Sequence, residues 1–509
     1  MNHVQKQKVL VFIVAYHAET TITSVVQRIP AALLNEYDVD VLIIDDSSGD
    51  RTFERSHELT KRTDLPFDIR VLFNPINQGY GGNQKLGYHY AIENGYDFVA
   101  LLHGDGQYAP ERLSDLLEPV TRGRAAAVLG SRMMIPGGAL RGGMPLYKYV
   151  GNKILSWFQN RLLRSNLTEF HSGYRVYSVR ALRSIPFERN SNDFHFDTEI
   201  IIQLMIAKLP IVEVPIPTYY GDEICHVNGL RYAANVALAT LRARLQELSL
   251  FYDKRYDCAP VPLSQYSPKL SFESTHSFTF DFIPPGSKVL DLGCAGGYVG
   301  FALKEQKGCR VTGVDALPGQ YDQELDSFYA RDLNDGLAGL PVEDHDFVLL
   351  LDVIEHLASP EGFLEELRER LSLNPNAELI ISTGNIAFIV TRLMLMLGQF
   401  NYGKRGILDL THTRLFTFSS LARILEQAGF VIVRTKAIPA PFALAIGDNV
   451  LSRALLKTNS LLNRVSSRLF AYQMIMRVKP LPTVKSLLHD AHRESDAKAQ
   501  LLAKAAAPR

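Results

Sequence analysis

The chain has 509 residues, which is enough for two or more domains of about 50 to 250 residues each. Its hydrophobic content of 46% can form packed cores, and its 54 basic and 54 acidic residues leave no net charge, which argues against nucleic-acid binding. The four cysteines have no paired metal-ligand spacing and fit a cytoplasmic protein. We expect no signal peptide, because the first six residues lead straight into a strand-like segment, and no membrane span, because no apolar run reaches about 18 residues.

Four apolar segments in the first half are predicted to be strands of a parallel sheet, each followed by a helix. They cover residues 8–15, 39–44, 69–73 and 98–102. This alternation predicts a doubly wound α/β domain. In such a sheet, ligands bind beyond the carboxyl ends of the strands.

Polar side chains follow the first two strands, where such a ligand would lie. Tyr16 and Glu19 follow the first strand, and Asp45 and Asp46 end the second. The tyrosine ring can stack on a base, and the two aspartates can accept hydrogen bonds from a base or from ribose hydroxyls. The aspartates also fit a turn with a helix cap, so the pattern alone leaves that alternative open.

A glycine-rich segment containing Gly79 and Gly81 precedes the next helix. Glycine lets the backbone approach a ligand closely, and the start of a helix favours phosphate. After the fourth strand come His103, Asp105 and Gln107, whose oxygen atoms suit a hard cation such as Mg²⁺ shared with phosphates.

Residues 103–107 resemble the Asp-x-Asp-x-Gln segment of family 2 glycosyltransferases, most closely those of the dolichol-phosphate-mannose synthase type. The resemblance extends over residues 8–222 and departs at His103, where that family has an aspartate. It implies a GT-A fold and an inverting, metal-dependent transfer from a nucleotide sugar. It also implies that Mg or Mn is held by Asp105 and Gln107, with Asp105 in a catalytic role.

The segment from Arg122 to Arg183 has eleven basic residues and one acid, Glu169. This imbalance favours an anionic partner, either a lipid phosphate or a membrane surface. Within it, residues 147–163 have the apolar spacing of an amphipathic helix, which is typical of a membrane-surface helix or of ordinary core packing.

The same family resemblance assigns the acceptor side. Arg132, Lys148 and Arg175 lie in segments that resemble those holding the acceptor phosphate, and Lys148 replaces the usual arginine. Glu169 would orient that phosphate or act as a catalytic base. The implied acceptor is a lipid phosphate or a glycan, with a peripheral contact to the inner face of the cell membrane.

We expect a glycosyltransferase domain over residues 1–250, a linker rich in proline and serine over 251–263, a second domain over 264–480 and a polar tail over 481–509. No internal repeat of 20–50 residues is apparent.

The second half opens with a strand, a glycine-rich turn and a helix over residues 288–300. Asp291, Gly293 and Gly297 lie in this unit, and Asp315 ends the next strand, as in nucleoside-binding βαβ units where an acid binds ribose.

The pattern Asp-x-Gly-x-Ala-x-Gly resembles class I methyltransferases that use S-adenosylmethionine, over about residues 264–480. The resemblance implies a Rossmann-like fold in which Asp332 lies near the adenine and Asp352 follows the fourth strand. His412 and His356 are candidate bases, and each also fits a structural histidine.

The sequence therefore predicts a bifunctional transferase of cell-surface polysaccharide biosynthesis. Two alternatives remain open. In the first alternative, the first domain would be degenerate and would only bind glycan. In the second, the methyltransferase alone would be active, and the first domain would place it at the membrane.

Overall fold

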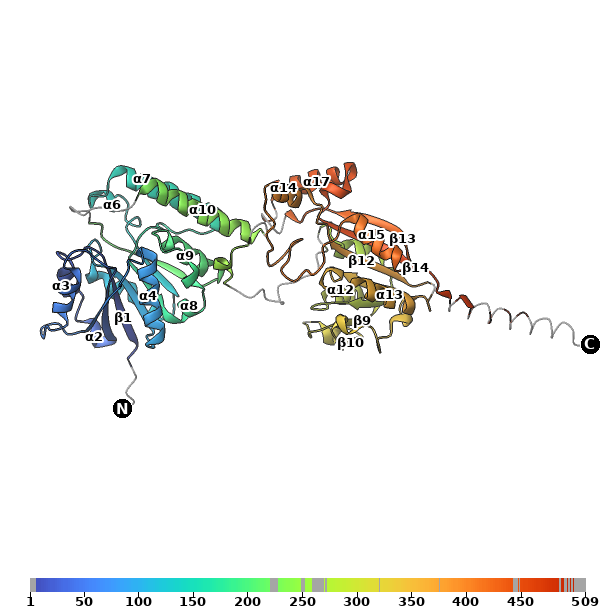
Figure 1. Ribbon diagram of the computed structural model, residues 1–509, viewed down its shortest axis with the longest axis horizontal. Coiled ribbons are helices and arrows are strands. Elements are labelled where there is room, and N and C mark those ends of the chain that lie inside the picture. The colour runs from blue at the N-terminus through green and yellow to red at the C-terminus, as the bar shows by residue number, and fades with distance from the viewer. Residues whose placement is uncertain are drawn as a thin grey trace, which may run out of the picture. The chain divides into compact units, whose positions relative to one another are not determined.

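The computed structural model describes residues 6–484 except 220–227, 249–251, 259–269, 271, 320, 375, 443–446 and 448, together with 487, 488, 492, 495 and 498. The chain divides into two compact units, residues 1–260 and 261–509 (Figure 1). Part of the expected linker is wrong, because residues 254–256 form a 3₁₀ turn of unit 1 in which Tyr256 is 1% exposed and Arg255 pairs with Glu199 of α9. The rest of its second half, residues 259–263, and most of the expected tail lie outside the described residues. None of the described helices is both long and apolar enough to cross a bilayer.

Unit 1 is built on a seven-stranded sheet in the order β3-β2-β1-β4-β6-β5-β7. Its strands are β1 (Lys8–Ala15), β2 (Asp38–Asp45), β3 (Asp68–Phe73), β4 (Phe98–His103), β5 (Ala127–Ser131), β6 (Arg175–Ser178) and β7 (Ile211–Pro215). Neighbouring strands run parallel, except that β6 is antiparallel to both β4 and β5. The apolar side chains of β1 and β2 are buried on both faces, which explains their uninterrupted hydrophobic sequences.

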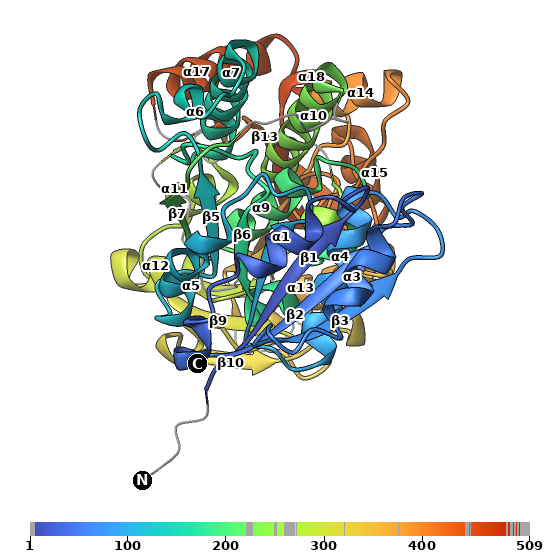
Figure 2. The same ribbon diagram turned by 90° about the vertical axis from the view of Figure 1, so that its left-hand side faces the viewer.

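Helices cover both faces of this sheet, and each face has its own hydrophobic cluster (Figure 2). The helices of unit 1 in the described residues are α1 (Ile22–Gln27), α2 (Leu33–Glu36), α3 (Thr52–Leu59), α4 (Tyr80–Glu93), α5 (Leu113–Thr121), α6 (Gly138–Arg141), α7 (Leu146–Leu163), α8 (Val179–Arg183), α9 (Phe196–Ile206) and α10 (Gly229–Glu247). The long helices α7 and α10 lie side by side in both views.

Helix α7 has an inverted distribution of side chains, in which polar residues are buried and apolar residues are exposed. Its buried residues are the polar Asn152, Ser156 and Gln159. Ile154 and Trp157 of its apolar stripe face outward and are 60% and 68% exposed, whereas Phe158 and Leu162 are partly buried. The exposed part of this stripe therefore does not form core within the described residues of unit 1.

Unit 2 contains a second seven-stranded sheet, in the order β10-β9-β8-β11-β12-β14-β13. Its strands are β8 (Lys288–Leu292), β9 (Arg310–Asp315), β10 (Ser327–Ala330), β11 (Phe347–Leu351), β12 (Glu378–Gly384), β13 (Phe430–Ile438) and β14 (Gln473–Pro480). The first five are parallel, and β14 runs antiparallel to both β12 and β13.

The helices of unit 2 are α11 (Thr275–Phe282), α12 (Tyr298–Lys307), α13 (Pro360–Leu371), α14 (Ile389–Met396), α15 (Phe418–Gln427), α17 (Val450–Val465) and α18 (Ser467–Phe470). Hydrophobic clusters lie on both faces of the sheet, as in unit 1. The prediction of two successive α/β domains, a GT-A fold and a Rossmann-like fold, is confirmed.

Candidate functional sites

The carboxyl ends of β1, β2 and β4 meet at one edge of the first sheet, and the polar residues predicted there lie along it. Tyr16 follows β1, and its ring is 48% exposed with one edge against His17. Glu19 accepts a hydrogen bond from the backbone N–H of Arg51, at 2.9 Å, which ties the β1 loop to the loop after β2.

Asp45 has the chemistry of a ligand contact. Its side chain is fully buried, and its Oδ1 accepts hydrogen bonds from the backbone and the hydroxyl of Ser48. Its Oδ2 is buried without a hydrogen-bond partner among the described residues. Burial raises the pKa of this carboxyl group, and a donor from a ribose or a base would satisfy the free oxygen.

Asp46, in contrast, accepts hydrogen bonds from the loop between β3 and α4. Its Oδ1 accepts hydrogen bonds from the side chain of Asn74 and the backbone of Gln78, both at 2.8 Å. These bonds fix the segment between β3 and α4, so Asp46 positions this loop and its Oδ1 is not available to a ligand.

The glycines before and at the start of α4 require a correction. A Cβ atom on Gly79 would lie 2.6 Å from the carbonyl oxygen of Asn192, and one on Gly81 would lie 2.7 Å from the Cβ of Phe196. The backbone N–H of Gly81 already donates to the Asn192 carbonyl. Both residues are glycine because residues 191–196 pack against this turn, and neither presents a free backbone to a phosphate.

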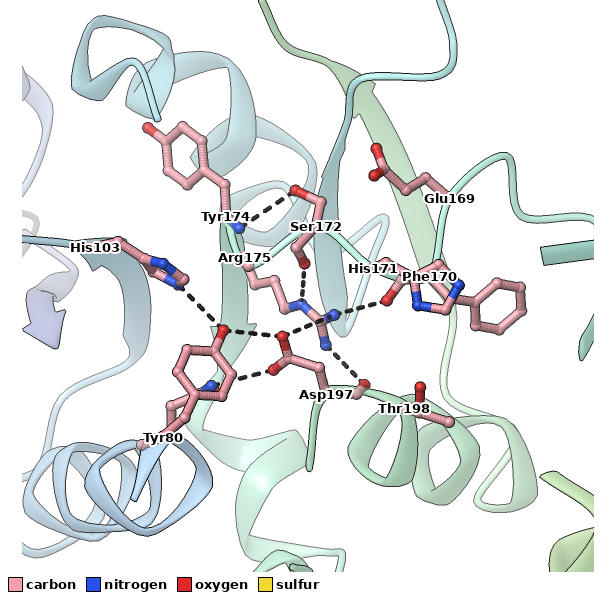
Figure 3. A network of polar contacts seen from close by, with 12 residues as sticks. Tyr80, His103, Glu169, Phe170, His171, Ser172, Tyr174, Arg175, Asp197 and Thr198 are labelled. Carbon is pink, nitrogen blue, oxygen red and sulfur yellow. Dashed lines mark hydrogen bonds and ion pairs between the residues drawn. The ribbon is translucent and has the colours of Figure 1, made fainter. Parts of the chain in front are cut away.

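His103, at the end of β4, belongs to a buried polar network (Figure 3). The hydroxyl group of Tyr80 donates to Asp197 at 2.9 Å and lies 3.1 Å from the Nε2 of His103. Because the single hydroxyl hydrogen is used by Asp197, the His103 Nε2–H is the donor to Tyr80. Burial lowers the pKa of His103 and keeps its ring neutral, so Nδ1 carries the lone pair.

Asp105 and Gln107 form a tight turn just beyond this histidine. The Asp105 Oδ1 accepts a hydrogen bond from the backbone N–H of Gln107 at 3.0 Å, and both side chains are partly exposed. Among the described residues, no group of three His, Cys, Asp or Glu side chains is placed to hold a metal ion by itself. The donors here fit a cation that takes its other ligands from a diphosphate.

The structure corrects the acceptor-binding role expected for Arg175. Its side chain is fully buried, and it donates to the backbone carbonyls of Phe170, Ser172 and Asp197 (Figure 3). It also forms a 3.4 Å ion pair with the Asp197 carboxylate. With these partners it holds β6 and α9 together and has no surface to offer a phosphate.

Glu169 also has a structural environment. It is 1% exposed and accepts hydrogen bonds from the backbone and guanidinium of Arg132 and from the Asn152 amide. Burial alone would raise its pKa, but the Arg132 charge and these hydrogen bonds bring the pKa below its usual value. The expected role as a catalytic base is therefore corrected, and Glu169 positions Arg132 instead.

Arg132 and Lys148, unlike Arg175, are both partly exposed. Arg132 lies just after β5, with its side chain 11% exposed in the ion pair with Glu169. Lys148 lies in the first turn of α7 and is partly exposed.

The sequence analysis missed Tyr80 and Asp197. Asp197 lies in the first turn of α9, where polar and acidic residues interrupt a strongly apolar stretch and are all buried. Acids inside such a stretch indicate buried partners, and that signal could have identified this network.

In unit 2, the turn between β8 and α12 has three residues with positive φ, namely Gly293 (76°), Ala295 (49°) and Gly297 (71°). A Cβ on Gly293 would lie 2.5 Å from the Val353 side chain. This glycine is thus required by the turn after β11, whereas the expected reason was close approach of a ligand.

Asp315 organises this turn. Its two carboxylate oxygens accept hydrogen bonds from the backbone N–H groups of Ala295 and Leu317, at 2.8 and 3.1 Å. Asp291 lies beneath it in β8, where burial and the charge of Asp315 raise its pKa to about 7. Asp291 is thus buried in the strand under the turn.

The other two predicted cofactor residues have different surroundings. Asp332 is exposed and caps a short 3₁₀ turn through the backbone N–H of Asn334. Asp352 has a φ of 55°, and its two oxygens accept hydrogen bonds from the side chains of Ser382 and Gln473, at 2.8 and 2.7 Å.

Two histidine rings meet beside the turn after β11, and a buried glutamate lies within that turn. The rings of His356 and His412 meet edge to face with centroids 4.8 Å apart, and their Nδ1–H groups donate to the carbonyls of Thr411 and Ile407. Glu355 is buried with its Oε2 unpartnered among the described residues, and burial together with Asp352 raises its pKa to about 8. Sequence reasoning chose His412 and overlooked Glu355.

Comparison with known proteins agrees with this division. The model of glycosyl transferase family 2 matches residues 10–185, and that of a methyltransferase domain matches residues 265–435. Undecaprenyl-phosphate mannosyltransferase of Micrococcus luteus is 32% identical over 182 residues, covering 35% of this chain and 70% of that protein. UDP-N-acetylglucosamine–dolichyl-phosphate N-acetylglucosaminyltransferase of Methanococcus voltae is 29% identical over 223 residues, covering 42% of this chain and 86% of the other.

Solved structures match each unit separately. Glucosyl-3-phosphoglycerate synthase from Mycobacterium tuberculosis has a TM-score of 0.37 and 18% identity, covering 47% of this chain and 80% of that chain. A SAM-dependent methyltransferase from Archaeoglobus fulgidus has a TM-score of 0.29 and 20% identity, covering 40% of this chain and 90% of that chain. From its sequence matches, the chain belongs to glycosyl transferase family 2 through its first unit and carries a methyltransferase domain in its second.

Proposed function

We propose that unit 1 transfers a sugar from a nucleotide sugar to a prenyl-phosphate acceptor, and that unit 2 transfers a methyl group from S-adenosylmethionine to a glycan-related acceptor. The first half rests on two aspartates at the carboxyl-end edge of the first sheet. Asp45, at the end of β2, has a buried oxygen without a partner among the described residues, and Asp105, just beyond β4, is partly exposed. The names of the relatives support the acceptor class, since both include a prenyl phosphate.

The nucleotide sugar would bind along the strand ends of unit 1. Tyr16 offers a ring face to the base, and Asp45 accepts from a base or ribose donor. A divalent metal, Mg or Mn, would be held by Asp105, by Gln107 and by the Nδ1 of His103, whose ring is oriented by Tyr80. When bound, the metal would neutralise charge on the departing nucleoside diphosphate.

The acceptor would be anionic. Arg132 is fixed by Glu169, and Lys148 lies at the start of α7, whose outward face is apolar. A phosphate group on a lipid would meet these cations while its hydrocarbon chain stayed in the bilayer beside α7. A phosphate acceptor is already ionised, so this reaction needs no strong base, which agrees with the lowered pKa of Glu169.

In unit 2, Asp315 and the turn at 293–297 would bind the nucleoside of S-adenosylmethionine, which supplies an activated methyl group. Transfer then requires that the acceptor is held in line with that group. His412 lies beside Asp352, and burial lowers its pKa, so its neutral ring would take a proton if the acceptor is a hydroxyl group. Glu355, with a pKa of about 8, already carries its proton at neutral pH.

Calorimetric titration of the full chain with UDP and GDP tests the glycosyltransferase assignment. We expect one of them to bind in the presence of Mn²⁺ and to lose at least ten-fold in affinity with EDTA or in Asp105→Asn. Asp115→Asn is the matched control, because that carboxylate pairs with Arg112 on the surface of α5. If neither nucleotide binds, unit 1 is a glycan-binding or membrane-targeting domain, and the methyltransferase alone is active.

A further inference from the structure

Unit 2 has helices with the same inverted character as α7 of unit 1. The buried residues of α17 are the polar Ser452 and Asn459. Its outward side is apolar, with Val450, Leu461 and Val465 between 60% and 84% exposed. Asn459 holds the helix in place, since it accepts from the backbone of Ala440 and donates to the carbonyl of Phe470.

Helix α14 repeats this pattern. Its one buried residue is Thr391, and the helix ends in Met396 and Leu397, which are 81% and 78% exposed. In Figures 1 and 2, α14 and α17 stand at the same end of unit 2. The amide of Asn385, just before α14, donates to the carbonyls of Arg468 and Ala471, in and directly after α18, the helix that follows α17.

The charges within the two segments that contain these helices have one sign, although Glu273 from outside them accepts a hydrogen bond from Ser460 of α17. Residues 386–408 and 449–470 contain seven basic residues and no acidic residue, in a chain whose overall charge is zero. The basic residues are Arg392, Lys404, Arg405, Arg453, Lys457, Arg464 and Arg468. Exposed apolar side chains flanked by cations are the composition of a surface that inserts at the boundary of an anionic bilayer.

We propose that α14 and α17 form a membrane-binding surface of the methyltransferase unit, and that its occupant is the anionic lipid surface. The apolar side chains enter the headgroup region, and the basic residues contact lipid phosphates. The proposal stands on this surface alone and holds whichever atom the enzyme methylates. Its consequence is that the second unit works at the same bilayer as a lipid-linked acceptor, without relying on unit 1 for its attachment.

Flotation of the full chain with vesicles of phosphatidylglycerol and phosphatidylcholine tests this surface. The variant Met396→Glu/Leu397→Glu/Leu461→Glu should lose at least ten-fold in binding. Leu373→Glu is the matched control, because Leu373 is 64% exposed after α13 and outside this surface, and it should bind as the wild type does. Lys457→Gln should weaken binding about five-fold, and this loss should disappear in high salt.

Two further measurements keep the result interpretable. All variants should keep the wild-type thermal unfolding curve, because the replaced side chains are exposed. In a background with Ile154→Glu and Trp157→Glu on α7, residual vesicle binding should persist and then vanish when the unit 2 changes are added. Wild-type binding by the unit 2 variant would overturn the proposal. Wild-type protein that does not bind vesicles would also overturn the proposal, because the apolar face would then be covered by a second copy or by unit 1.

Discussion

At the scale of single residues, charged side chains of this protein divide into those that hold the fold and those that face a ligand. The sequence placed Arg175 and Arg132 together on the acceptor side, but only burial separates them. Arg175 is fully buried among carbonyls and Asp197, whereas Arg132 lies at the surface end of its ion pair with Glu169. A motif gives the position of an arginine along the chain but not its burial. Burial depends on elements that lie far away in the sequence.

Arg175→Met is expected to reduce stability strongly. The change leaves the Asp197 carboxylate buried without its cation, and breaking such a pair costs about 3–5 kcal/mol. Urea unfolding measures this loss. Arg180→Met is the control, because Arg180 is exposed on α8 and its replacement should change stability by no more than about 0.5 kcal/mol. Equal stability of the two variants would contradict the structural role of Arg175.

Asp291 gives unit 2 a pH-dependent stability. Its folded pKa of about 7 lies above the value of about 4 for an unfolded aspartate, so the folded state binds the proton more tightly. The stabilising contribution is therefore present below about pH 4 and is lost as pH rises toward 7.

Asp291→Asn should abolish this loss and be more stable than the wild type at pH 8 by up to about 4 kcal/mol, with little difference at pH 4. Chemical unfolding at the two pH values measures the difference. Glu355, whose pKa is about 8, stays in both proteins and cancels in the comparison. A constant difference between variant and wild type across this range would show that Asp291 ionises as a normal aspartate.

At the scale of elements, long apolar runs were predicted well. The strands β1, β2 and β4 lie within one residue of their expected bounds at each end, because strands buried on both faces have uninterrupted apolar sequences. The strands β13 and β14 were not predicted. β13 is partly exposed, and its pairing with β14 joins segments separated by two helices, which no local pattern reveals.

The glycines of α4 show the same limit. Their spacing indicated a phosphate site, but the packing partner is residues 191–196, more than a hundred residues away. Gly81→Ala should reduce stability by about 1–3 kcal/mol, because the new methyl group meets the Ser191 carbonyl and the Phe196 side chain.

Gly151→Ala in α7 is the matched change for this prediction. No atom lies within 4 Å of the added methyl group, so the variant should gain about 0.5–1 kcal/mol from its higher helix propensity. Thermal unfolding of the two variants measures both changes in stability. A tolerated alanine at position 81 would mean that the turn moves freely, and the phosphate hypothesis for this glycine would regain support.

At the scale of the whole molecule, the central proposal is that one chain carries two transfer sites that work separately. The two units have separate sheets and separate hydrophobic clusters. Each of them presents inverted helices with exposed apolar residues, on α7 in unit 1 and on α14 and α17 in unit 2. The proposed meeting point of the two activities is therefore a lipid-linked acceptor.

Sugar transfer to a polyprenyl phosphate in vesicles, with labelled UDP-glucose, UDP-N-acetylglucosamine and GDP-mannose offered in turn, tests this account most directly. The wild type should transfer one of the sugars in a metal-dependent reaction. Asp105→Asn should lose at least about a hundred-fold in rate, since it weakens the charge neutralisation on which the leaving group depends. Asp315→Ala, which should weaken S-adenosylmethionine binding about ten- to hundred-fold, should transfer sugar at the wild-type rate. Undiminished transfer by Asp105→Asn, or a parallel loss in Asp315→Ala, would contradict two independent sites.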